Sequence, residues 1–262
     1  MSDTAIKISG LKKSFGSKNS TTEVLKGIDL EISKGQIIGY IGPNGAGKST
    51  TVKIICGILE HFEGEIEVLG KNLKKDALNV KQLIGYVPEN GAIYEQLTPR
   101  EYLGFLGKLF GIENKIIDKR IEQLLAYFEM SKHIDQRMDT FSKGMRQKIM
   151  LVAGLINNPE ILFLDEPLSG LDANSVILVK DLLINLARDG KTIFYCSHLM
   201  DIVEKISDRI ILINEGKVIA DGSFDELKGD KSSSLEALFA QLTGKESIEG
   251  QSDMLINSLK EE

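Results

Sequence analysis

The stretch IGPNGAGKST, residues Ile41 to Thr50, decides the fold, because three glycines, a proline and an asparagine pack poorly but can wrap backbone around an anion. Four of its residues fit the pattern G-x-x-x-x-G-K-[ST]: Gly42, Gly47, Lys48 and Ser49. An apolar run precedes the stretch and a helical pattern over residues 50–56 follows it, as the pattern requires. The sequence therefore predicts a phosphate-binding loop.

Each residue type in this loop has a task in binding phosphate. Glycines let backbone N–H groups converge on the oxygens, and the N-terminus of the following helix adds partial positive charge. The Lys48 ammonium neutralises phosphate oxygens, and the Ser49 hydroxyl can ligate Mg²⁺. We expect the whole loop to contact the nucleotide: Gly42, Pro43, Asn44, Gly45, Ala46, Gly47, Lys48, Ser49 and Thr50.

Three short apolar runs are typical of parallel strands buried on both faces, and each is followed by a polar loop and a helical pattern. They are QIIGYIG, ILFLD and TIFYCSH, at residues 36–42, 161–165 and 192–198. This pattern predicts an α/β fold. Because ligands collect beyond the carboxyl ends of such strands, the residues that end or follow the runs are the candidates for chemistry.

Two carboxylates and a histidine stand at those strand ends. Asp165 can orient Mg²⁺ through water, and Glu166 can align or deprotonate the attacking water. Alone, two carboxylates before a proline are more often a solvated turn, but together with the phosphate loop they favour a catalytic role. His198 falls on the same sheet edge, where it could hydrogen-bond a γ-phosphate or the water.

Other segments predict the remaining architecture. Charged and apolar residues alternate over 28–32 and 65–70, which indicates half-exposed antiparallel strands. Thr98, Pro99 and Glu101 form a capping box at the start of a helix that Gly111 ends. Two sets of apolar residues follow at helical spacing: Tyr102, Phe105, Leu106, Leu109 and Phe110, then Ile117, Ile121, Leu124, Leu125 and Phe128. We expect an all-helical subdomain at about 98–141, inserted into the α/β core, with its aromatic stripe in the core.

The C-terminal part predicts a hairpin over 213–222, a capping box from Ser223 to Glu226, and an amphipathic helix before a polar, mobile tail. Leu235, Leu238, Phe239 and Leu242 form the apolar face of that helix. We therefore divide the chain into a main domain over 1–225 and a C-terminal helix and tail over 226–262.

Composition and charge argue against several classes of protein. The net charge of −6 and the lack of a dense Lys/Arg stripe argue against nucleic acid as the main partner. The longest apolar run, residues 149–156, is far short of the roughly 20 residues that cross a bilayer, and the N-terminus has no apolar signal core. Cys56 and Cys196 stand in apolar contexts and are expected to be buried thiols. These features favour a cytoplasmic location.

The order of the motifs resembles that of the ATP-binding cassette (ABC) ATPases over Ile6 to about Gly222. The motifs are the phosphate loop, GYVPE, FSKGMRQK, ILFLDEPLSGLD and CSH. The resemblance implies a P-loop NTPase of the ABC type, with a mostly parallel core sheet flanked by helices. It also implies an N-terminal antiparallel β-subdomain and the inserted all-helical subdomain.

The resemblance implies roles for individual residues. Phe15 matches the aromatic residue that stacks on adenine, and Glu89 stands where the family usually has a glutamine that contacts Mg²⁺ and water. Asp165 matches the metal-orienting carboxylate, Glu166 the catalytic carboxylate and His198 the switch histidine. ATP and Mg²⁺ are therefore the expected ligands, with Ser49, Glu89 and Asp165 at the metal.

The resemblance also implies a second ATPase chain. In the family, ATP is sandwiched between two chains arranged head to tail, and the signature of one chain closes over the phosphates held by the other. Ser142, Lys143, Gly144 and Asp172 match the residues that reach the partner chain's nucleotide. The usual Leu-Ser-Gly-Gly-Gln signature is altered here, because Lys143 and Met145 replace a glycine and the glutamine. A hydroxyl, a small residue's N–H and a helix N-terminus remain to cover a γ-phosphate.

Glu89 is a second departure from the family pattern. It adds a carboxylate beside Asp165 and Glu166, which favours metal binding but also raises the pKa of one of the three groups.

The leading hypothesis is the ATP-hydrolysing subunit of a membrane transporter, most like bacterial exporters of drugs, antimicrobial peptides or ions. It would work with a separate permease at the cytoplasmic face of the membrane. One alternative is a soluble ABC ATPase of cofactor assembly or of chromosome or repair machinery. Another is a regulator without turnover, against which Glu166 and His198 argue.

The segment PENGAIYEQLTPRE, residues 88–101, joins Glu89 to the predicted helical subdomain. Ile93, Tyr94 and Leu97 are apolar within this loop, and two interpretations are open. They either cap the helical subdomain or form the surface on which the membrane partner docks. The family resemblance favours docking.

Overall fold

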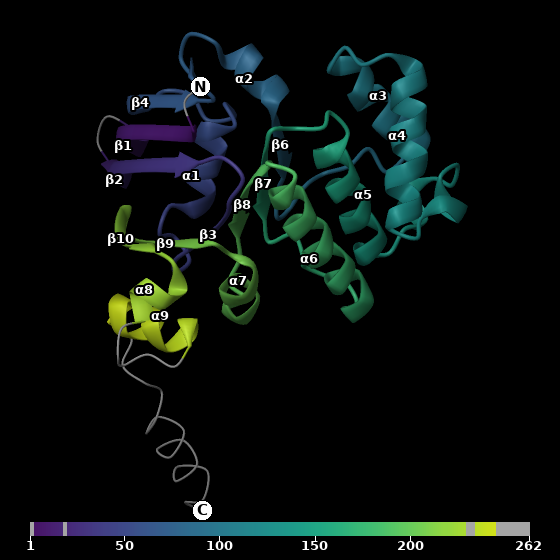
Figure 1. Ribbon diagram of the computed structural model, residues 1–262. Coiled ribbons are helices and arrows are strands. Elements are labelled where there is room, and N and C mark those ends of the chain that lie inside the picture. The colour runs from purple at the N-terminus through teal and green to yellow at the C-terminus, as the bar shows by residue number, and fades with distance from the viewer. Residues whose placement is uncertain (1–2, 18–19, 229–233, 245–262) are drawn as a thin grey trace, which may run out of the picture.

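The computed structural model describes residues 3–17, 20–228 and 234–244. It is an α/β protein with two sheets and a helical lobe (Figure 1). The larger sheet has the order β10-β9-β3-β8-β7-β6. Its strands are β3 Ile37–Ile41, β6 Ile84–Val87, β7 Ile161–Asp165, β8 Thr192–Cys196, β9 Arg209–Asn214 and β10 Lys217–Gly222.

The predicted parallel core sheet is confirmed. β3 pairs in parallel with β8 and β9, β7 pairs in parallel with β6 and β8, and only the predicted hairpin β9–β10 is antiparallel within this described sheet. Every residue of β3, β7 and β8 is buried, which is why these strands read as continuous apolar runs. Because β3, β6, β7 and β8 run in one direction, their carboxyl ends meet at one edge.

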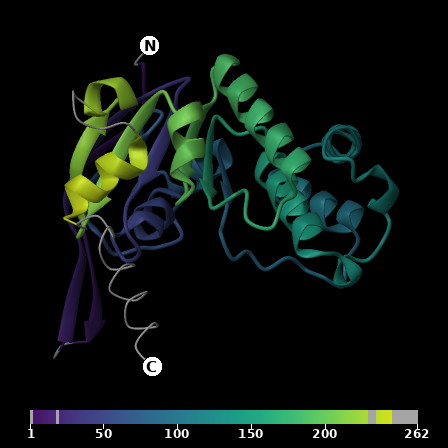
Figure 2. The ribbon, with the colours of Figure 1, turned by 90° about the horizontal axis from the view of Figure 1, so that it is seen from below.

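The predicted antiparallel subdomain is also confirmed. Its sheet has the order β2-β1-β4-β5, with β1 Thr4–Ser17, β2 Ser20–Ser33, β4 Glu63–Val68 and β5 Lys71–Asn72. The long β1–β2 hairpin extends away from the body of the molecule (Figure 2). Helix α1, Lys48–Ile55, shares a core with the inner faces of both sheets, so the phosphate loop that precedes it is anchored by the packing of the helix.

The helical lobe contains α3 Pro99–Leu109 and α4 Asn114–Tyr127, and it packs on α5, Lys143–Leu155. The predicted capping box at Thr98 and Glu101 is present. The prediction that the aromatic stripe is core is wrong for Phe105, which is 47% exposed, and Leu109, from the same predicted apolar set, is 67% exposed. The buried side of α3 carries Leu103 and Gly107 instead. A Cβ at Gly107 would lie 2.7 Å from Ile117, so the glycine lets α3 and α4 pack closely.

The remaining α-helices flank the core sheet: α2 Ala77–Leu83, α6 Ala173–Arg188, α7 Met200–Ile206, α8 Phe224–Lys228 and α9 Leu235–Thr243. The predicted capping box at Ser223 and Glu226 and the helix with Leu235 and Leu238 buried are both present. The predicted polar tail, 245–262, lies outside the described residues. The predicted division of the chain at 225–226 falls inside α8. Within the described part of the chain, no helix has the length and hydrophobicity that a membrane span requires.

Candidate active site

The ends of four parallel strands surround one cavity of about 750 Å³. Residues from the phosphate loop after β3 and the segments after β6, β7 and β8 line it, and β2 adds one residue. The lining residues are Val24, Asn44, Gly45, Gly47, Lys48, Ser49, Thr50, Glu89, Asp165, Glu166 and His198. The structure therefore brings together most of the residues that the sequence predicts for ATP, metal and catalysis.

The phosphate loop closes tightly over the end of β3. A Cβ at Gly42 would lie 2.2 Å from the Ile213 carbonyl oxygen, and Gly47 has φ +110° at the N-cap of α1, so both positions require glycine. Lys48 Nζ donates to the carbonyl oxygens of Gly42 and Pro43, at 2.6 and 3.1 Å. The ammonium is thus held in the cavity by neutral groups, and its charge can act on phosphate oxygens.

Glu166 is held from several directions. Its Oε2 accepts a hydrogen bond from Ser197 Oγ at 2.9 Å, and its Oε1 accepts one from the His198 backbone N–H at 2.8 Å. The imidazole Nδ1 of His198 also lies 2.8 Å from Oε1. The carboxylate is only 13% exposed, whereas the His198 side chain is 76% exposed. These contacts fix the orientation of the Glu166 carboxylate, which lines the cavity.

The backbone of Glu166 is in the left-handed region, with φ +49°. Its N–H donates to the Cys196 carbonyl oxygen at 2.9 Å, which continues the pairing of β7 with β8 past the end of the strand. A left-handed conformation costs an L-residue about 1–2 kcal/mol. Such strain, kept at the end of a buried strand in a polar cavity, is typical of a functional position.

Asp165 ends β7 and is 5% exposed. Burial raises the pKa of this carboxyl, and the negative charges of Glu89 and Glu166 add to the rise. A hydrogen bond from Ser49 and the charge of Lys48 act in the opposite direction. The sequence prediction that three neighbouring carboxylates raise one pKa therefore applies to Asp165, although burial is the larger cause.

We expect Glu89→Gln to raise the melting temperature of the nucleotide-free chain by about 1–3 °C at pH 7.5. A carboxyl with a raised pKa in the folded state destabilises the fold above that pKa, and removing the Glu89 charge reduces this penalty. The gain should shrink as the pH falls through about 4, the ordinary pKa of an aspartate, and vanish only well below it, where Asp165 is protonated in both the folded and the unfolded state. Thermal unfolding across this pH range measures it, with the exposed Glu67→Gln as control. An unchanged or lower melting temperature would contradict the charge argument.

The oxygen atoms near the loop suit Mg²⁺ bound together with a nucleotide. Ser49, Glu89 and Asp165 supply a hydroxyl and two carboxylates to one cavity, which are hard oxygen donors. Among the described residues, no three His, Cys, Asp or Glu side chains form a metal cluster by themselves. Mg²⁺ commonly takes only one or two protein carboxylates and shares phosphate oxygens of the substrate.

Four predicted residues lie on a different surface. Ser142 caps α5 by accepting a hydrogen bond from the Met145 N–H, and Lys143 Nζ donates to Ser169 Oγ at 3.0 Å. A Cβ at Gly144 would lie 2.8 Å from the Gly170 carbonyl oxygen, so the signature packs against the loop that ends at Asp172. Among the described residues, those lining the cavity do not include Ser142, Lys143, Gly144 or Asp172.

Phe15 also lies outside the cavity lining. Its ring is 41% exposed on β1, with Lys13 Nζ 5.0 Å from the ring centroid. The cavity instead contains Val24, from the neighbouring strand β2. No sequence pattern distinguishes Val24, because its place depends on strand register. The sequence does not single out Ser197 as a functional residue either, although its position next to His198 in the CSH motif is a usable signal.

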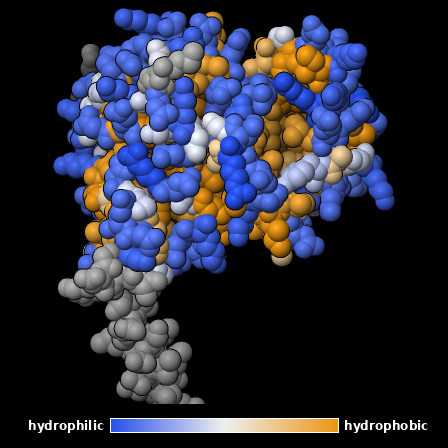
Figure 3. Space-filling view, viewed as in Figure 1, coloured by the Kyte–Doolittle hydropathy of each residue, from blue (hydrophilic) through white to orange (hydrophobic). Residues whose placement is uncertain are grey.

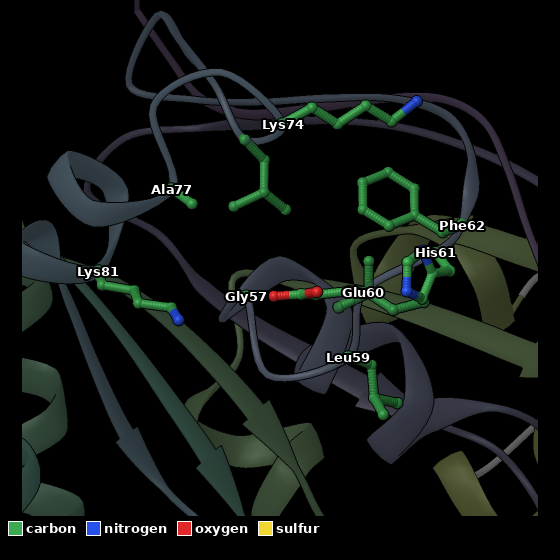
Figure 4. A pocket seen from close by; sticks show the side chains of 10 residues that line it. Gly57, Leu59, Glu60, His61, Phe62, Lys74, Ala77 and Lys81 are labelled. Carbon is green, nitrogen blue, oxygen red and sulfur yellow. The ribbon is translucent and has the colours of Figure 1, made fainter.

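A smaller cavity, of about 380 Å³, lies near the C-terminal end of α1 (Figure 4). Phe62 and Leu59 form part of its wall, and Lys74 Nζ lies 5.0 Å from the centre of the Phe62 ring. None of the residues that the sequence predicts for nucleotide or metal binding lines this cavity.

Both predicted thiols, Cys56 and Cys196, are buried and free.

Comparisons with known proteins agree with this geometry. The profile of the family described as "ABC transporter" matches residues 25–169. The chain is 38% identical to the linearmycin resistance ATP-binding protein LnrL of Bacillus subtilis, over 83% of this chain and 68% of that one. It is 35% identical to the ABC transporter ATP-binding protein NatA of the same organism, over 89% and 96%. It is also 35% identical to the daunorubicin resistance ATP-binding protein DrrA3 of Streptomyces coeruleorubidus, over 88% and 72%.

Solved structures support the same assignment. The structure of an ATP binding subunit of an ABC transporter superposes with a TM-score of 0.83 at 29% identity, covering 91% of this chain and 99% of that one. The structure of cbiO1 from Clostridium perfringens, described as part of the ABC transporter complex cbiONQ, has a TM-score of 0.74 at 27% identity, over 88% and 92%. Fold, site and sequence agree, and the chain belongs to the ABC transporter family as an ATP-binding subunit.

Proposed function

We propose that this chain hydrolyses ATP with Mg²⁺ and powers an exporter by forming an ATP-dependent head-to-tail dimer. The observation that carries the proposal is the single cavity in which the phosphate loop, Asp165 and Glu166 converge. Phosphoryl transfer to water needs phosphate neutralisation and an oriented water, and these side chains supply both.

Glu166 is the proposed catalytic base. Its hydrogen bonds from Ser197 and His198 orient the carboxylate, so that it can accept a proton from a water in the cavity. Lys48 and the α1 N-terminus would hold the phosphates of ATP. Mg²⁺ bound by Ser49, Asp165 and Glu89 would neutralise charge on the phosphates. His198, largely exposed beside Glu166, can hydrogen-bond the γ-phosphate or the water.

The dimer is proposed because, among the described residues, those lining the ATP cavity do not include the signature residues of the same chain. Ser142 and Lys143 are exposed at the α5 N-terminus, and Asp172 is exposed at the start of α6. A helix N-terminus with a serine and a lysine, and with no acidic residue in its first turn, suits a phosphate. In a head-to-tail pair, this surface would cover the nucleotide of the partner chain. Phe15 would stack on the adenine of the ATP that its own chain binds.

The transport role rests on the relatives. LnrL and DrrA3 are named resistance proteins, and cbiO1 belongs to a transporter complex, so we infer a drug or related exporter with a separate permease. We place the chain at the cytoplasmic face of the membrane, bound through that permease. We also propose that residues 1–225 form the ATPase domain, with 226–262 as a C-terminal addition.

A groove beside the segment 88–101 suits the permease. A cavity of about 420 Å³ lies between β6, α3 and α5, and Ile58, Tyr102, Leu106 and Phe110 line it, among other residues. Figure 3 shows hydrophobic side chains in the hollow beside α3. Tyr94 is 65% exposed, and its ring stacks edge-on against Tyr102, with centroids 6.1 Å apart. Ile93 and Leu97 pack against the core instead, which fits the capping interpretation for these two residues, so we propose the docking role for Tyr94.

We expect Tyr94→Ala to abolish co-purification with the permease while ATP hydrolysis by the isolated chain stays within about twofold of the parent. The ring supplies exposed apolar area beside the groove, and it lies outside the ATP cavity lining. A tagged chain is extracted from membranes in mild detergent, and mass spectrometry identifies the bound membrane protein. Ile177→Ala, 63% exposed on α6, is the matched control. Undiminished recovery with Tyr94→Ala would rule out this docking residue.

A further inference from the structure

The segment of residues 88–98, here called the connector, runs alongside helix α5. A Cβ at Gly91 would lie 2.5 Å from the sulfur of Met150, in the middle of that helix. Further along, Glu95 Oε1 lies 2.9 Å from Arg146 Nη1, in the first turns of α5. At its end, the Leu97 carbonyl oxygen accepts a hydrogen bond from the Met138 N–H at 3.0 Å. The connector is therefore fastened to α5 and to the turn that precedes it.

The Arg146 side chain contacts two other segments. Besides the ion pair with Glu95, its Nη2 donates to the Asp139 carbonyl oxygen at 3.3 Å. Its backbone N–H donates to the Ser142 carbonyl oxygen at 3.0 Å. One side chain thus links the connector, the turn before α5 and the helix that begins with the signature.

Stability of the helix does not explain this arginine. A positive charge near a helix N-terminus opposes the helix dipole, and α5 has no acidic residue in its first turn to offset Lys143 and Arg146. The pair is also partly solvated, with Arg146 35% and Glu95 45% exposed, and such pairs contribute little to folding. The main effect of the ion pair is therefore to fix the position of the connector relative to α5.

The connector links the ATP cavity to the helix that begins with the signature. Glu89, near its start, lines the ATP cavity, whereas Glu95 is bound to the helix whose N-terminus carries Ser142 and Gly144. We propose that Arg146 and Glu95 are positioning residues, which fix the N-terminus of α5 to the connector and so set how the signature meets the partner chain's nucleotide. The inference rests on the proposed head-to-tail dimer, and it gives the connector a role inside the ATPase as well as in docking.

The test measures ATP-dependent dimerisation instead of turnover. In a Glu166→Gln background with ATP and Mg²⁺, we expect Glu95→Gln and Arg146→Gln each to raise the dimer dissociation constant about tenfold, and the double variant to raise it no further than either single variant. Analytical ultracentrifugation gives the constant. ATP binding to the dilute monomer, measured by calorimetry, should be unchanged, because neither side chain lines the cavity.

The two single variants separate positioning from simple charge. If only the charge near the phosphate matters, Arg146→Gln weakens the dimer and Glu95→Gln strengthens it, and this opposite response would overturn the proposal. Arg100→Gln is the matched control, because Arg100 pairs with Asp135 at 2.8 Å within the same lobe and, among the described residues, its side chain forms no ion pair or hydrogen bond with α5. Dimerisation like the parent's in both variants would also refute it. A parent that fails to dimerise would overturn the proposed function itself, and this inference with it.

Discussion

Glu166→Gln is expected to lower ATP turnover by about 10²- to 10⁴-fold, the usual contribution of a positioned general base. The change keeps the shape of the side chain and removes its basicity. The amide oxygen can still accept from the His198 N–H, and the amide NH₂ can donate to Ser197 Oγ, so the local geometry should persist. ATP binding should therefore remain, because Lys48 and the phosphate loop are untouched.

Two measurements test this expectation. Phosphate release from the purified chain gives the turnover, and size-exclusion chromatography with ATP should show a stable dimer of the variant. Glu160→Gln is the control, because Glu160 is an exposed glutamate just before β7, where it pairs with the mostly buried Lys191 and lies outside the cavity lining. A Glu166→Gln chain that hydrolyses ATP like the parent would show that another group is the base.

Much of the fold could be predicted because its signals are local. Continuous apolar runs indicated strands buried on both faces, and the residues at their ends converge because parallel strands share one edge. The capping box at Thr98 and the glycine after α3 likewise depend on neighbours in sequence. For the same reason, the positions of Lys48, Asp165 and His198 in the sequence are enough to predict the cavity that they line.

The features that the sequence patterns predicted wrongly or did not indicate depend on contacts between distant segments. Helical spacing gives α3 an apolar face, but only the approach of α4 at Gly107 decides that Leu103 is buried and Phe105 exposed. The left-handed backbone of Glu166 and its bond from Ser197 follow from the pairing of β7 with β8. Nothing local marks the pair of Glu95 with Arg146, because 51 positions separate them.

A mixing experiment tests the head-to-tail dimer with the second large expected effect. Lys48→Ala removes the ammonium of the phosphate loop, and Ser142→Arg places a bulky cation at the exposed α5 N-terminus, so each chain alone should be nearly inactive. In a mixed dimer, both defects fall in one composite site and the other site is intact. Mixing equal amounts should restore roughly a quarter of the parent activity, because half of the dimers are mixed and each has one of two sites intact.

The matched control uses two defects from the same cavity. Lys48 and Glu166 both line it, whereas Ser142 is absent from its described lining. A mixture of Lys48→Ala and Glu166→Gln chains therefore leaves one defect in each site of every mixed dimer and should show no recovery. If the first mixture recovers and the second does not, the signature acts on the partner's nucleotide. If neither mixture recovers, although cross-linking shows that mixed dimers form, Ser142 does not act across the interface and the head-to-tail arrangement is wrong.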